Sequence, residues 1–83
     1  MTKDFLNKLK KGIRKAGMGT IAGLWEHMNY SEATDIAILC ERKGVALSLT
    51  NIAETLSEND SLLEAVYNHA EEAEKRDLEI LAS

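Results

Sequence analysis

Apolar residues recur along most of the chain at intervals of three and four positions, which is the spacing of one face of an α-helix. The first such stripe consists of Phe5, Leu9, Ile13 and Ala16. Lysines flank this stripe, and Gly17 follows it. Glycine is unfavourable inside a helix because it loses backbone entropy there, and it readily forms a C-terminal cap, so Gly17 is expected to end the helix. The pattern predicts a basic amphipathic helix over residues 1–16.

Two shorter helices are predicted next. One begins with Thr20 as its N-cap and ends near residues 29–30. The other begins with Ser31 as its N-cap and ends at Gly44, because acidic residues follow its start and basic residues precede its end, where each complements the helix dipole. Trp25, Met28 and Tyr30 cluster around the first of these helices, either as core residues or as anchors for a partner.

A fourth helix is predicted from Ser48 or Thr50, and a fifth and longer one over residues 61–81, opening with the capping-box pattern Ser61 to Glu64. The inward stripe of this long helix is Leu63, Val66, Ala70, Ala73 and Ile80. The sequence therefore predicts an all-α protein, a compact bundle of about five short helices with a longer C-terminal helix. Residues 1–83 form a single helical domain, in which an acidic helical core over residues 20–83 follows the basic helix.

Composition narrows the class of protein. With 83 residues, 45% hydrophobic and 29% charged, the chain suits one small folded domain rather than a disordered tail. It has no apolar run of the roughly 18 residues that a membrane span needs, and its N-terminus does not resemble a secretory signal. Cys40 is the only cysteine, so no internal disulfide can form. These features predict a cytoplasmic protein that does not bind a membrane.

Charge is divided unevenly along the chain. Residues 1–15 carry six basic side chains and one acidic one, whereas the remaining residues carry four basic and thirteen acidic ones. Such asymmetry indicates either a partner of opposite charge or two parts that face each other within the molecule. The basic patch consists of Lys8, Lys10, Lys11, Arg14 and Lys15. Its helix can dock on the rest of the chain, contact nucleic acid or protein, or lie on an anionic membrane.

Residues 49–72 have the outline of a helix-turn-helix, a common DNA-binding device. Ala53 is a small residue in the first helix, and apolar residues occupy most of the positions that lock the second. However, residues 44–83 carry nine acidic side chains against two basic ones, Lys75 and Arg76, and DNA binding depends on neutralising phosphates. A DNA-binding regulator whose basic first helix contacts the phosphates is therefore the alternative rather than the preferred reading.

Signals for chemistry are weak. His69 and Glu72 are spaced i, i+3 and could share a metal, but no complete metal-binding motif accompanies them. Cys40 falls on an apolar stripe, where cysteine usually behaves as a small buried hydrophobe. No glycine-rich phosphate loop is present. We therefore expect no enzyme activity, no metal and no cofactor.

The sequence favours a small interaction protein that binds, and inhibits or modulates, a larger protein with a basic surface. Small inhibitors from phages and mobile elements share this size and charge, although the likeness is compositional and identifies no family. If the partner handles nucleic acid, a row of carboxylates can imitate phosphates. The expected partner-binding residues are Glu54, Glu58, Asp60, Glu64, Tyr67, Asn68, Glu71 and Glu72. A homodimer is also expected to be possible, because a small domain gains buried apolar surface by pairing.

Overall fold

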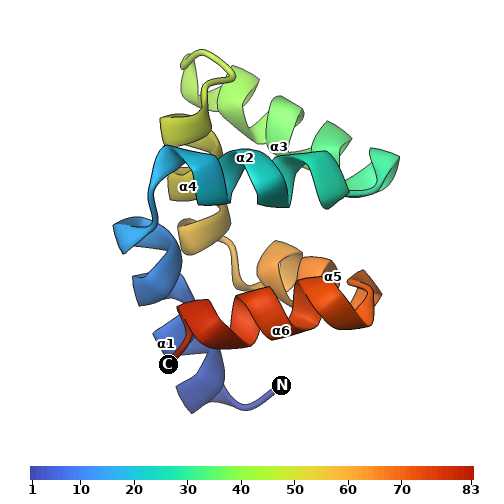
Figure 1. Cartoon of the computed structure of the whole chain (residues 1–83). Coiled ribbons are helices and arrows are strands. Elements are labelled where there is room, and N and C mark those ends of the chain that lie inside the picture. The colour runs from blue at the N-terminus through green and yellow to red at the C-terminus, as the bar shows by residue number, and fades with distance from the viewer.

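The computed structural model describes all 83 residues and is entirely helical (Figure 1). Its six helices are α1 (Lys3–Lys15), α2 (Met18–His27), α3 (Tyr30–Lys43), α4 (Leu49–Glu58), α5 (Asp60–His69) and α6 (Glu72–Leu81). In Figure 1, α2 and α3 run in opposite directions in the upper half, and α5 and α6 do so in the lower half. The all-α prediction is confirmed, with six helices in place of about five.

Helix α4 is the centre of the packing, because it contacts α1, α2, α3 and α5. It consequently buries both apolar and small polar residues, among them Leu56, Thr55 and Ser57. The buried hydroxyls have local partners, since Ser57 Oγ donates to the carbonyl of Glu54 at 2.8 Å and Thr55 Oγ1 lies 3.6 Å from Cys40 Sγ. No buried polar side-chain atom lacks a partner, so this polar content does not weaken the core.

The basic first helix is docked on the rest of the chain. Leu6, Leu9 and Ile13 are buried and belong to the same core cluster as the inward residues of the later helices. Helix α1 packs on α4 and also on α6, so the first and last helices lie side by side and the C-terminus ends next to α1 (Figure 1). At this crossing, Gly12 lies directly against the backbone of Leu81.

The predicted long helix over residues 61–81 is wrong. Ala70 and Glu71 both have extended backbone, with ψ of 145° and 166°, and they separate α5 from α6, which have ten residues each. The break lets α6 turn back over α1, where Leu78 and Ala82 become buried. A continuous helix would have carried these residues away from the core, and burying their apolar surface favours the turn.

The break also changes which residues of the last helix face the core. Ala73 and Ile80, which the long stripe places inward, are exposed, and the side chain of Ile80 is 69% exposed. The extended backbone of Glu71 changes the direction of the chain, and this new direction determines which residues of α6 face the core. Two apolar residues thus remain on the surface of α6.

The helix caps agree only in part with expectation. Ser48 caps α4, accepting from Asn51 N at 3.2 Å, and Gly44 ends α3 with a left-handed φ of 73°, as predicted. The N-cap of α3 is Asn29 rather than Ser31, and Asn29 forms a reciprocal capping box with Glu32. Glu32 lies three residues after Asn29, which is the spacing that a capping box requires and that Ser31 does not have with Glu32.

The other two predicted starts are also displaced. Helix α2 begins at Met18 after Gly17, so Thr20 lies inside the helix. Helix α5 begins at Asp60 after Asn59, so Ser61 lies in its first turn and forms no capping box. In both cases the helix begins before the residue predicted to be its N-cap.

Candidate protein-binding surface

The acidic residues at the junction of α4 and α5 are paired with cations of the same molecule. Glu58 Oε2 accepts from Lys43 Nζ at 2.8 Å, and Asp60 Oδ1 accepts from Lys10 Nζ at 2.8 Å. The hydrogen bond from Lys43 lowers the pKa of Glu58, and the same bond raises the pKa of Lys43. These carboxylates are therefore partly neutralised before any partner arrives.

The predicted basic patch is divided between two roles. Lys10 binds Asp60, and Arg14 Nη2 donates to the carbonyl of Ser57 at 3.4 Å, so both hold α1 on the α4–α5 junction. The remaining lysines of the patch form an exposed row on the outer side of α1, which we call the lysine row: Lys8, Lys11 and Lys15. Within it, only Lys8 forms an ion pair, an exposed one with Asp4 at 3.2 Å.

A different part of the predicted acidic face has no cation bound to it. Asn68, Glu71 and Glu72 are exposed where α5 ends and α6 begins, and Glu64 is half-buried one turn earlier. None of these three glutamates forms an ion pair. We call this set the acidic corner, and it consists of Glu64, Asn68, Glu71 and Glu72.

Tyr67 is fixed in place rather than free to contact a partner with its whole ring. Its ring packs edge-on against Phe5 at 5.2 Å between centroids, and Lys75 Nζ lies 5.5 Å from its centroid. Tyr67 therefore joins α5 to α1 and α6, and it is half-buried. Tyr30 is the most exposed aromatic residue, with 88% of its surface accessible at the start of α3.

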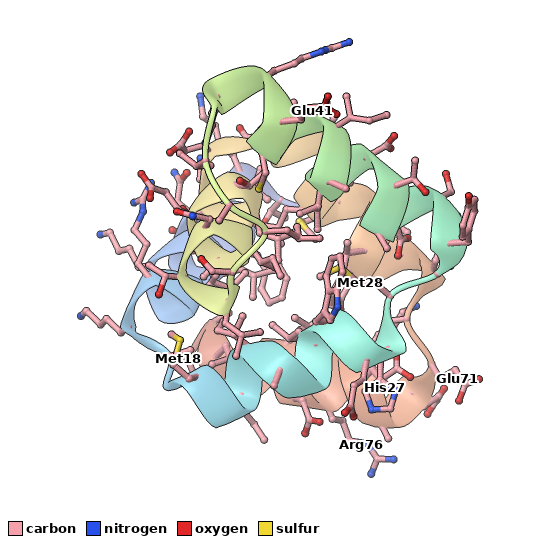
Figure 2. All side chains as sticks on the ribbon, turned by 90° about the horizontal axis from the view of Figure 1, so that it is seen from above. Met18, His27, Met28, Glu41, Glu71 and Arg76 are labelled. Carbon is pink, nitrogen blue, oxygen red and sulfur yellow. The ribbon has the colours of Figure 1, made fainter.

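Two histidine–glutamate contacts hold the helix connections at this end of the molecule. His69 Nδ1 lies 3.1 Å from Oε1 of the buried Glu32, and His27 Nδ1 lies 3.3 Å from Glu74 Oε1. The first contact joins α3 to α5, and the second joins α2 to α6. Figure 2 shows His27 and Glu71 at the same end of the molecule, with Glu41 away from them.

This arrangement changes the reading of His69. The sequence suggests a shared metal with Glu72, but the imidazole instead contacts Glu32, whose other carboxylate oxygen accepts from the backbone N–H of Asn29. No group of three histidine, cysteine, aspartate or glutamate side chains is arranged to hold a metal ion. The contact fixes the position of α5 relative to α3. Sequence reasoning missed Glu32 as the residue that links them, because its contact spans 37 positions of the chain.

The geometry of α4 and α5 bears on the helix-turn-helix reading. Only Asn59 separates the two helices, whereas the motif uses a turn of about three to four residues. The first turn of α5 carries Asp60, and Tyr67 of the same helix is partly covered by Phe5 of α1. DNA reading by α5 stays a prediction, and the lysine row is the surface left for phosphate contacts.

The chain matches no protein-family model, no curated protein sequence and no solved structure. None of its helices is long and apolar enough to span a bilayer.

Proposed function

We propose that this chain is a non-enzymatic binding protein whose acidic corner docks on a basic surface of a larger protein and thereby inhibits or modulates that partner. The observation that supports this is that Glu64, Glu71 and Glu72 gather where α5 ends and α6 begins and that none of them forms an ion pair. The acids at the α4–α5 junction are paired internally, so pairing with a new partner there would first break an existing contact. The acidic corner carries no such cost.

The surroundings of the acidic corner suit a protein partner. Tyr30, at the start of α3, is an exposed aromatic residue, and tyrosine is enriched among the residues that dominate binding energy at interfaces. The Glu32–His69 contact joins the start of α3 to the end of α5. Tyr30 lies two residues before Glu32 in the sequence, and Glu71 lies two residues after His69. In this proposal Tyr30 supplies apolar contact and the carboxylates supply charge complementarity.

If the basic surface of the partner is a nucleic-acid-binding site, the carboxylates would occupy places that phosphates otherwise take. The proposed surface is smaller than the acidic face expected from sequence, because Glu58 and Asp60 are paired with Lys43 and Lys10, and Glu54 lies near Lys43. The mimic would then consist of the acidic corner alone.

The test is to purify the wild-type chain with its partner from the native host and to compare two variants of equal charge. One variant changes Glu64, Glu71 and Glu72 to lysine. The control changes Glu26, Asp35 and Glu41 to lysine, which are exposed and unpaired on α2 and α3. We expect the acidic-corner variant to lose the partner and the control to keep it, with salt weakening the wild-type complex.

Two measurements keep the outcome interpretable. The glutamine versions of the acidic-corner substitutions remove charge without placing cations at the start of α6, and circular dichroism shows whether each variant is folded. Equal loss of the partner in both charge variants would contradict the proposal. A wild-type chain that ignores proteins and shifts a duplex DNA, with the shift lost in Lys8→Glu/Lys11→Glu/Lys15→Glu, would support the DNA-binding alternative in its place.

A further inference from the structure

Ile80 projects from the surface of α6 between two grooves. It is 69% exposed, the highest value for any aliphatic side chain among the exposed large hydrophobic residues. On one side lies a groove between α6 and the lysine row of α1. On the other side lies a groove between α6 and α2, lined by Gly19, Gly23, Leu24 and Asp77 among others. An apolar side chain thus stands between two depressions that nothing in the chain fills.

The groove beside α2 has room for an incoming side chain. A Cβ atom built on Gly19 or Gly23 would meet nothing within 4 Å, so the space above these two glycines is empty. Leu24 and Leu81 supply apolar walls. A branched aliphatic side chain from another molecule would bury its surface there, and Ile80 itself has that shape and chemistry.

Charges are placed so that the surface complements itself. The lysine row lies beside the C-terminal end of α6, whereas Glu74 in the first turn of α6 and Asp77 near its middle lie beside the other groove. If two copies place their α6 helices antiparallel, the acidic end of each helix meets the lysine row of the other copy. A two-fold axis near Ile80 satisfies this for both copies at once, because such an interface uses the same patch twice.

We propose that a second copy of this chain docks on this surface, with α6 antiparallel to its counterpart. Ile80 of each copy enters the groove between α2 and α6 of the other, and Asp77 approaches the lysine row of the other copy. A stable interface buries about 800 Å² per partner, which is near one-sixth of the 5099 Å² that the chain exposes. The two-fold arrangement closes on itself, so it gives a dimer and no filament.

The proposal concerns a different surface from the acidic corner, so the two can fail separately. The test measures molar mass by sedimentation over micromolar to millimolar protein concentration. We expect a monomer–dimer equilibrium in the wild type, weakened at least about tenfold by Ile80→Glu. The control is Ile38→Glu, which makes the same change on α3 at an aliphatic side chain that is 40% exposed. It should leave the equilibrium unchanged.

The charge contacts have their own test. Lys11→Glu should weaken the dimer, and Lys11→Glu combined with Asp77→Lys should restore it, because the pair is reversed across the axis. All these side chains are exposed, so circular dichroism should show folded monomers throughout. A wild type that stays monomeric at millimolar concentration, or a dimer equally weakened by Ile80→Glu and Ile38→Glu, would overturn the proposal.

Discussion

Replacing Gly12 with alanine should destabilise the protein, although the same change inside a helix usually stabilises it. A Cβ atom at position 12 would lie 2.6 Å from the carbonyl carbon of Leu81 and 3.2 Å from its Cα atom, and it would also meet the carbonyl oxygen. Each of these atoms belongs to the backbone, so no side-chain rotation relieves the contact. Helices α1 and α6 must move apart by roughly 1.5 Å to bring the carbonyl oxygen to ordinary van der Waals separation.

The magnitude follows from two opposing effects. Alanine gains about 1 kcal/mol over glycine in a helix interior. Overpacking costs about 1–3 kcal/mol, and we take the upper end, about 3 kcal/mol, because the obstacle is backbone and the movement opens a gap beside the buried Leu78. The free energy of unfolding should therefore fall by about 2 kcal/mol, which lowers the Tm of a domain this size by roughly 8–16 °C.

The assay is chemical and thermal unfolding followed by circular dichroism at micromolar concentration. The matched control is Gly23→Ala in α2, where the new Cβ meets nothing within 4 Å and stability should rise by about 0.5–1 kcal/mol. A Gly12→Ala protein that is as stable as the wild type, or more stable, would refute the claim that this glycine lets α1 and α6 cross.

Two further predictions concern the helix ends and the charged junction. Asn29→Ala removes the capping box of α3 and should cost about 1 kcal/mol in unfolding free energy by denaturant titration. The pKa of Glu58, measured by NMR, should lie below its ordinary value and return toward it in Lys43→Ala. Because folding lowers that pKa, the stabilisation from Glu58 is present at neutral pH and disappears as pH falls below about 4.3. An Asn29→Ala protein as stable as wild type, or a Glu58 pKa that ignores Lys43, would contradict these expectations.

The sequence predicted the fold class because burial on one face leaves a periodic trace. The stripe that contains Leu9 and Ile13 predicted the first helix but left open whether it docks on the core, whereas Gly44 marked the end of α3 because a left-handed cap favours glycine. The break at Ala70 and Glu71 left no such trace. Neither residue is glycine or proline, and the turn is favoured by contacts that α6 makes with the distant α1.

The candidate surface was predictable only in outline. Net charge predicted an acidic face, but it could not show which carboxylates are paired within the molecule. The Lys10–Asp60 contact joins residues fifty positions apart, and the Lys43–Glu58 contact also crosses between helices. These pairs depend on how α1 and α3 dock on α4, so only the folded chain shows which of the predicted acids are paired internally.

The Gly12–Leu81 contact also constrains the order of events during synthesis. The two residues are separated by about seventy positions, so α1 cannot complete its packing until nearly the whole domain has been made. Until then the apolar stripe of α1 has only part of its covering, and closing so long a loop is slow and exposes apolar surface to aggregation. The lysines beside that stripe would keep the incomplete chain hydrated and so oppose aggregation until α6 is made.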